Sequence, residues 1–476
     1  MRREKNINSM RHLRTLTAIT AAAAFHICAQ TTQPAQYLHQ PIIPEAWEYT
    51  PDSHMTLPAN DGWWTVFGVP MLSTLIEKAE TGNFNVTSAL KRMEIAEKGI
   101  ALSRSGYFPQ LDVNAGWTAG QSAGAANRPV TPSASYRHWN LGLSANWEID
   151  LFGRIASQVK AGKAGYRASK ADYDAVMVSL AASVAKTYMQ LRTAQAQYAV
   201  AQQHLHSQKE ILRIVEARFK AGIGDMLEVT QAKTVLYSTE ATVPALEASI
   251  RTAANSIAVL TGQYPAQGAP PLLEAAEMPV CPPLPATGVP ADLLRRRPDI
   301  IASEATLAQY AAMIGVAKKD FLPTLAISGS ISTQARDITD LFGSHSLAYE
   351  VAPTLSWTLF DGMARNIRVA EARLQMEEAV ESYNMTVMNA IEEVDNAIIS
   401  FNASVREAEL NEQAAEQSRK SLELSVDLYK RGLTDFYNVT NAQMSYLENQ
   451  SSAVAARGTA LAAVVALYEA LGGSPE

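Results

Sequence analysis

The amino-acid sequence predicts a mixed α and β membrane protein, built from two copies of a unit that combines long helices with short strands. Three observations support this fold class: an internal repeat, four stretches in which apolar and polar residues alternate, and two helical stretches of unusual length. Residues 217–232 and 427–442 share six identities at a spacing of 210 positions. A repeat of that period indicates duplication of a whole structural unit.

Residues 1–29 have the features of a signal peptide, because a basic start is followed by the short apolar run Leu16–Ile27. Cys28, at the end of this segment, is a candidate for lipid attachment; cleavage after Ala29, which would remove it, is the alternative. Residues 30–62 are predicted to be extended. The formal net charge of −7 makes nucleic acid a poor candidate partner for an exported chain.

Residues 63–263 form the first copy, predicted to contain helices, two strands and a helical hairpin. Apolar side chains occupy every second position of residues 111–117 and 139–149, which is the period of a β-strand with two different faces. Residues 157–220 contain no proline, and their apolar positions recur every three or four residues. Such a helix is about 90 Å long at about 1.5 Å per residue. A second helix is predicted to return over residues 226–260.

Residues 264–290 are rich in proline and are predicted to connect the copies without regular structure. The second copy, residues 291–473, repeats the pattern of the first. Its predicted strands cover residues 325–332 and 349–359, and apolar residues from Val387 to Val405 step by four and three, as in a coiled coil. Its returning helix is predicted over residues 436–471.

The polar faces of the four strands carry mostly small side chains. One interpretation is a soluble sandwich with one wet face, and another is a set of tilted membrane strands whose polar face lines a water-filled lumen. Four strands cannot close a barrel, and lipid does not tolerate open sheet edges, so in a membrane several chains would share one barrel. That barrel would continue into a tube of long helices. The predicted lumen-facing residues are Asn140, Ser144, Asn146, Ser328, Ser330, Thr354 and Ser356.

The turns between the long helices are predicted to be the tips of two helical hairpins. Glycine at such a turn adopts positive φ without strain, and aspartate caps the helix that returns. The tip residues are Gly222, Gly224 and Asp225 in the first copy, and Gly432, Thr434 and Asp435 in the second.

No catalytic, metal or cofactor motif is found in the sequence, and we expect a protein that is not an enzyme. His204 and His206 point about 200° apart on a helix, so they cannot bind one metal together. The run Arg295–Arg297 is expected to pair with acidic residues, with Pro298 starting a helix. Cys281 lies in a proline-rich segment without a histidine nearby, which does not favour a nucleophile.

A longer motif points to a known family. The segment Gly288–Ser330, and above all Leu294–Ile300 with the sequence LRRRPDI, resembles the signature of the outer-membrane factor family, the TolC-like ducts, in its NodT-type lipoprotein branch. Further pieces of the resemblance are Tyr107–Pro109, Trp147–Arg154 and Leu359–Gly362. The resemblance covers the chain from about Trp63 to Gly473.

This resemblance implies a homotrimer in the outer membrane of a Gram-negative bacterium, with four strands per chain in one 12-stranded barrel and a helical tunnel across the periplasm. It further implies a periplasmic adaptor and an inner-membrane pump of the RND type as partners, and export of drugs or other small toxic molecules. A duct for type I protein secretion and a soluble coiled-coil scaffold are the alternatives. Tyr37, Pro41 and Pro44 resemble the segment that follows the lipidated cysteine in this branch.

The resemblance also assigns roles to the hairpin tips, where the family docks its adaptor and narrows its channel. Asn438 and Asn441 stand where the family often has aspartates that ring the constriction, and Glu228 and Gln231 hold the corresponding positions of the first copy. A ring of asparagines carries no fixed charge. The departure therefore puts the cation selectivity of an aspartate ring in doubt for this chain.

Overall fold

The computed structural model describes residues 43–44, 47, 62–123, 132–283 and 290–473. The chain divides into two compact units, Met1–Pro41 and Ile42–Glu476, and all the described residues belong to the second. The predicted signal peptide and Cys28 lie outside the described residues.

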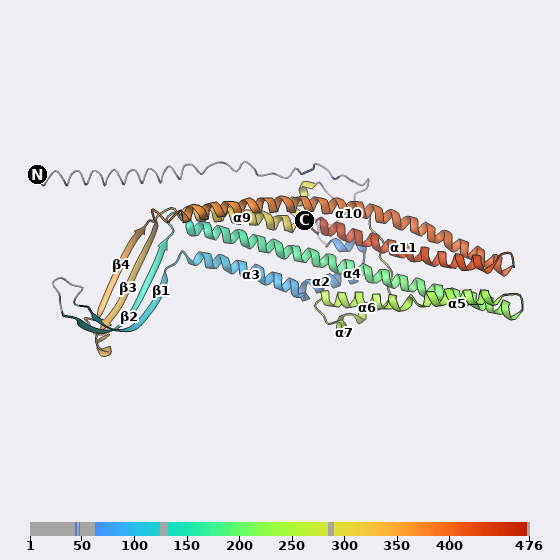
Figure 1. Cartoon of the computed structure of the whole chain (residues 1–476), viewed down its shortest axis with the longest axis horizontal. Helices are drawn as coiled ribbons and strands as arrows, with labels where there is room; N and C mark the ends of the chain where they lie inside the picture. Colours follow the sequence, from blue (N-terminus) through green and yellow to red (C-terminus); the bar gives the residue numbers. More distant parts are fainter. Residues whose placement is uncertain (1–42, 45–46, 48–61, 124–131, 284–289, 474–476) are drawn as a thin grey trace. The chain divides into compact units, whose positions relative to one another are not determined.

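The two copies have nearly the same order of helices and strands (Figure 1). The first contains η1 (Trp63–Phe67), α2 (Pro70–Gly82), α3 (Phe84–Ser105), β1 (Gln110–Ser122), β2 (Ala134–Ile149), α4 (Arg154–Lys220), α5 (Met226–Glu240) and α6 (Val243–Leu260). The connecting segment contains α7 (Pro265–Gly268) and η3 (Pro270–Leu272). The second copy contains η4 (Pro290–Asp292), α8 (Leu293–Arg296), α9 (Pro298–Lys319), β3 (Thr324–Ala335), η5 (Ile338–Asp340), β4 (Leu347–Ser356), α10 (Ala364–Lys430) and α11 (Phe436–Ala470).

The long helices α4 and α10 have 67 residues each, and each is about 100 Å long at about 1.5 Å per residue. The start of α4 is fixed by Asp150, whose carboxylate accepts hydrogen bonds from the backbone N–H groups of Ile155 and Ala156. On α10, Val387 and Val394 are fully buried, together with other residues of the predicted seam. The predicted long helices are thus confirmed.

The returning helix of the first copy differs from the prediction of one continuous helix. It is broken between α5 and α6 at Ala241–Thr242, just before Pro244. Proline has no backbone N–H and its ring clashes with the carbonyl four residues earlier, so it is placed in the first turn of a new helix. The second copy has Val454 at the equivalent position, and α11 continues unbroken. The linker also differs slightly, because its prolines start the short turns α7 and η3.

The four strands form one antiparallel sheet in the order β1-β2-β3-β4. They have 10 to 16 residues and so include strands longer than predicted. However, β4 ends at Ser356, whereas the alternation predicted a strand to Leu359. The backbone carbonyl of Thr358 instead accepts a hydrogen bond from the Arg365 guanidinium, which draws the chain into the start of α10.

The helices pack into one large buried cluster beside α2 and a smaller one near the hairpin tips. In the large cluster the ring of Trp63 stacks on Tyr468, with centroids 5.1 Å apart. By length and composition alone, α9 and α11 are apolar enough to cross a membrane. Both helices pack against α4 and α10 within the helical part of the unit (Figure 1).

Candidate functional site

The polar face of the sheet carries all seven residues that the alternation predicted to share a face. The register places Ser144 opposite Ser330, and Asn146 opposite Ser328. Asn114 joins this face by donating from Nδ2 to Oγ of Ser144 at 3.2 Å. On the edge strands, Asp112 of β1 lies opposite Ser144, and Glu350 of β4 lies opposite Ser330. This face is therefore polar, with carboxylates toward both edges of the sheet.

The opposite face is apolar and is bounded by tryptophans. Leu143 lies opposite Val113 on β1 and Ile331 on β3. Trp139 and Trp147 stand four residues on either side of Leu143, about 27 Å apart at about 3.4 Å per residue. This spacing matches the apolar band of outer-membrane barrels, which aromatic girdles flank.

The sheet is open along both edges within the described chain. Each of β1 and β4 pairs with one neighbour only, so one side of each strand presents backbone N–H and C=O groups without a strand partner. Such edges must be paired where the surroundings contain no water. A second chain is the natural source of that pairing.

The hairpin tips are built largely as predicted. Gly222 and Gly432 have φ of 74° and 70°, a conformation that disfavours side chains. Oδ1 of Asp225 accepts a hydrogen bond from the backbone N–H of Leu227 and caps α5. Asp435 occupies the N-cap position of α11, but its side chain makes no capping bond, so that prediction is wrong.

Gly224 and Thr434 hold equivalent positions in the two turns. Neither has positive φ, so the glycine is not needed there for its backbone freedom. A Cβ on Gly224 would approach the backbone nitrogen of Phe219 to 3.1 Å. In the second copy Thr434 has a side chain at this point, and its Oγ1 accepts a hydrogen bond from Nδ2 of Asn438 at 2.7 Å.

The four residues predicted for the constriction have different surroundings. Asn438 and Asn441 are exposed on α11, and Gln231 is half-buried on α5. Glu228 is also half-buried, and its Oε2 accepts a hydrogen bond from the hydroxyl of Tyr429 at 2.8 Å. Glu228 therefore connects the two hairpins.

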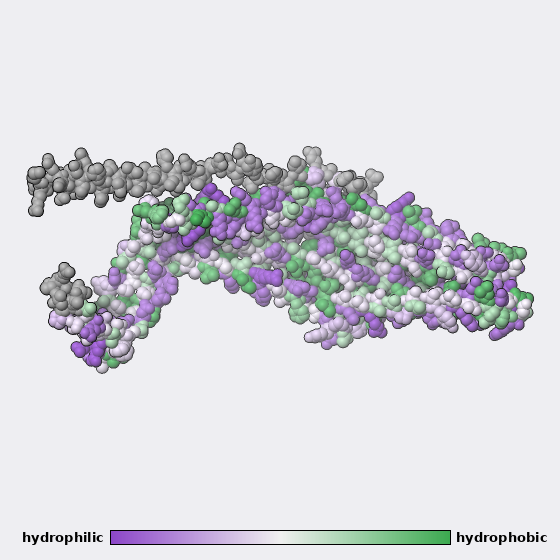
Figure 2. Space-filling view, in the orientation of Figure 1, coloured by the Kyte–Doolittle hydropathy of each residue, from purple (hydrophilic) through white to green (hydrophobic). Residues whose placement is uncertain are grey.

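Tyr429 is a tip residue that the sequence pattern missed. It is buried, and the guanidinium of Arg218 lies 4.6 Å from its ring centroid. Burial and the bond to Glu228 raise the pKa of Tyr429 to about 12, which keeps its hydroxyl protonated. The signal was present in the repeat, because the first copy has Phe219 at the position of Tyr429. Apolar side chains gather around both tips (Figure 2), among them Phe219, Ile223, Leu227 and Leu433.

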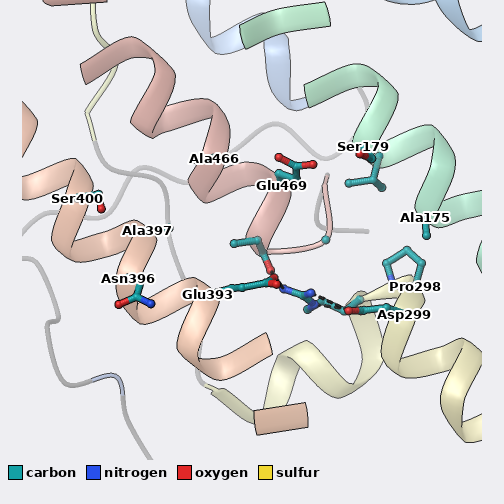
Figure 3. A pocket seen from close by; sticks show the side chains of 14 residues that line it. Ala175, Ser179, Pro298, Asp299, Glu393, Asn396, Ala397, Ser400, Ala466 and Glu469 are labelled. Carbon is teal, nitrogen blue, oxygen red and sulfur yellow. Dashed lines mark hydrogen bonds and ion pairs between the residues drawn. The ribbon is translucent and has the colours of Figure 1, made fainter. Parts of the chain in front are cut away.

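The tripeptide Arg295–Arg297 contributes a buried charge near the middle of the helices. Arg297 contacts Asp299 and Glu393 at 2.7 Å each and donates to the carbonyl of Ala470 at 2.9 Å (Figure 3). Burial opposes the charged form, but the bonds to the two carboxylates outweigh it and raise the pKa of Arg297. The predicted pairing is confirmed for Arg297, and Pro298 starts α9. These side chains line a cavity of about 650 Å³.

The remaining candidates of the sequence have structural surroundings. Nε2 of His204 lies 2.6 Å from Oε1 of Gln450, and burial lowers the pKa of His204, whereas His206 is exposed. Burial raises the pKa of the Cys281 thiol and disfavours a reactive thiolate. Within the described part of the chain, no cluster of three or more His, Cys, Asp or Glu side chains is arranged to hold a metal ion.

Known proteins share this arrangement. The family model described as outer membrane efflux protein matches residues 75–263 and 289–473. The pyoverdine export outer membrane protein OpmQ of Pseudomonas aeruginosa is 27% identical over 97% of both chains. Nodulation protein T of Rhizobium leguminosarum is 27% identical over 82% of this chain and 83% of its own.

Solved structures agree with the sequence comparisons. The outer-membrane channel OprN has a TM-score of 0.83 at 30% identity, covering 91% of this chain and 98% of its own. The open state of the MtrE outer membrane channel of Neisseria gonorrhoeae has a TM-score of 0.80 at 27% identity, over 93% of this chain and 98% of its own.

Proposed function

The chain belongs to the outer membrane efflux protein family, and we propose that it is the outer-membrane duct of a tripartite efflux system. It is an efflux channel of the outer membrane, and its TolC-like helices extend into the periplasm. The family consists of channels rather than enzymes, and we infer a passive duct without chemistry of its own. The observation that carries the proposal is a four-stranded sheet with one polar face, one apolar face and two open edges.

We infer a homotrimer from the open edges. Four strands are too few for a barrel, and three chains would supply twelve, a size within the range of outer-membrane barrels. In that assembly β4 of one chain pairs with β1 of the next, and no edge is left in lipid. The face of Ser144 then lines the lumen, and the face of Leu143 contacts lipid.

The hairpin tips are the proposed docking surface for a periplasmic adaptor. They lie at the far ends of α4 and α10, about 100 Å along the helices from the sheet. Their exposed apolar side chains are suited to burial against a protein partner. We place the constriction at the same end, with Asn438, Asn441, Glu228 and Gln231 on the returning helices.

The adaptor would connect the duct to an inner-membrane pump of the RND type. Relatives are named for different cargoes, including pyoverdine for OpmQ, cations for CusC of Escherichia coli and toluene for TtgI of Pseudomonas putida. A passive duct leaves the choice of cargo to its pump. We propose drugs or other small toxic molecules as the cargo class, because relatives are named for the efflux of toluene and of solvents.

Lipid attachment at Cys28 is proposed from the sequence, and palmitate is the expected acyl group. Labelled palmitate supplied to growing cells should be incorporated into the wild-type protein and not into Cys28→Ser. Incorporation into both proteins, or into neither, contradicts the proposal.

The assembly is tested with the full chain in detergent. Mass photometry should give the mass of three chains, and the protein should fractionate with outer membranes. Deletion of the gene should sensitise cells to toxic small molecules, and the wild-type copy should restore resistance. A monomer that stays soluble without detergent would contradict the shared barrel.

A further inference from the structure

The apolar face of the sheet contains a groove of about 350 Å³ that is not part of the proposed duct. Residues of all four strands line it, together with the loop between β3 and β4. Its apolar lining consists of Val113, Leu141, Leu143, Ile331, Phe342 and Leu347. An apolar cavity of about 150 Å³ holds a benzene molecule, so this groove has room for a longer hydrocarbon.

Phe342 is the one aromatic side chain among the residues that line the groove. It belongs to the loop between β3 and β4 and is 79% exposed, yet it lines the groove together with Leu347. The loop is ordered by Ser346, whose hydroxyl oxygen lies 2.7 Å from the carbonyl oxygens of both Leu341 and Gly343 and shares its one hydrogen between them. The wall that Phe342 forms is therefore attached to a defined loop.

A second copy of the chain cannot cover this groove in the proposed assembly. Neighbouring chains pair through the backbone edges of β1 and β4, in the plane of the sheet, while the groove is formed by side chains on one face of the sheet and is centred on β2 and β3. That face is the one proposed to contact the membrane. The loop at its end points away from the helices, so the groove lies in the outer half of the membrane (Figure 1).

A positively charged side chain, that of Arg137, lies beyond the groove on the same face of the sheet. Trp117 and Trp139 form an aromatic pair there, with ring centroids 6.3 Å apart. Arg137 lies two residues from Trp139, toward the end of β2 that is farther from the helices. It is about 14 Å along β2 from Leu141 at about 3.4 Å per residue. It is 57% exposed, and its contact with Asp337 is long at 3.7 Å, so guanidinium donors remain for another anion.

We propose that the groove binds an acyl chain of lipid A, the phosphorylated glycolipid of the outer leaflet, and that Arg137 contacts its phosphate. This inference rests on the proposed function, because it needs the face of Leu143 to lie in the membrane. The apolar lining accounts for the acyl chain. A guanidinium just outside the aromatic girdle accounts for the phosphate, which arginine binds with charge-assisted hydrogen bonds.

Binding of purified lipid A to the detergent-solubilised full-length assembly tests the proposal, with native mass spectrometry as the readout. Phe342→Ala should weaken binding of both lipid A and dephosphorylated lipid A. Arg137→Gln should weaken binding of lipid A by about tenfold, as expected for one charge-assisted hydrogen bond, and leave the dephosphorylated lipid unaffected. Matched controls are Ile338→Ala and Arg336→Gln, exposed residues near the same loop that do not line the groove.

Wild-type affinity in both test variants, or equal losses in the controls, would overturn the site. Equal binding of phosphatidylethanolamine and lipid A by the wild-type protein would overturn the assignment of the ligand. All variants should still form membrane-inserted assemblies. If the wild-type chain does not insert into membranes, the proposed function fails, whereas inserted assemblies without lipid A binding contradict only this inference.

Discussion

Tyr429 on α10 donates its hydroxyl to Oε2 of Glu228 on α5 at 2.8 Å, and this bond links the two helical hairpins at their tips. The repeat does not reproduce it. At the positions 210 residues away, Phe219 replaces Tyr429 and Asn438 replaces Glu228. Phenylalanine has no hydroxyl to donate, so each chain makes this link once. In the proposed trimer, the contacts between hairpins of neighbouring chains would therefore differ from the contact within a chain.

Replacing Tyr429 with Phe should loosen the tip. The substitution removes a hydrogen bond to a carboxylate, which we expect to contribute about 1–2 kcal/mol because Glu228 is only half-buried. Single-channel recording should show a larger conductance or more frequent opening. Tyr437→Phe is the matched control, since Tyr437 is 68% exposed at the same tip. Identical recordings for both variants would show that the link does not hold the tip closed.

Replacing both Asn438 and Asn441 with Asp should change ion selectivity. Each is exposed on α11, and a trimer of the double variant would gain six negative charges at the proposed constriction. Mutual repulsion should also make closure less stable. Reversal potentials in a salt gradient measure the shift toward cations. The matched variant Asn441→Gln keeps the amide and should leave selectivity unchanged, and an unchanged potential in the double variant argues against a constriction here.

Sequence periodicity predicted most of the fold, because long helices and strands repeat their pattern over many residues. It failed where a single side chain decides the path, as at Pro244, which divides the first returning helix. It also failed at Thr358, whose carbonyl binds Arg365 and ends β4 early. At the tips it found the turns but missed Tyr429: the repeat marks the position with an aromatic residue in both copies, but periodicity does not reveal a hydrogen bond between residues 201 positions apart.

The two faces of β2 should respond differently to charge. Leu143 stands midway between Trp139 and Trp147 on the proposed lipid face, so Leu143→Arg should cost roughly 2–4 kcal/mol at the membrane centre. Ser144→Arg should cost far less, because that side chain would enter the water-filled lumen. The yield of heat-resistant assemblies in outer membranes measures the difference. Equal losses for both variants would mean that the faces are assigned the wrong way round.

Gly432 should tolerate asparagine better than leucine. Its φ of 70° costs roughly 1–2 kcal/mol for a residue with a Cβ, and asparagine accepts this conformation more readily. An added Cβ would meet no atom within 4 Å, so the chain itself should still assemble. We expect Gly432→Leu to abolish export and Gly432→Asn to retain much of it, measured as drug resistance of a deletion strain. Normal resistance with Gly432→Leu would show that the tip is not the docking surface.

His204 should make the helical part of the protein less stable in acid. Burial lowers its pKa despite the opposing contact with Gln450, so the folded state favours the neutral ring. The unfolded state binds a proton as the pH falls below about 6.5, and the folded state does so only at lower pH. Unfolding is therefore favoured progressively as the pH falls through that range.

Thermal unfolding from about pH 8 to about pH 5 should show this loss of stability in the wild-type protein, and less of it in His204→Gln. Exposed His206 provides the control, because His206→Gln should keep the wild-type pH profile. If His204→Gln loses as much stability in acid as the wild-type protein, other groups cause the acid sensitivity.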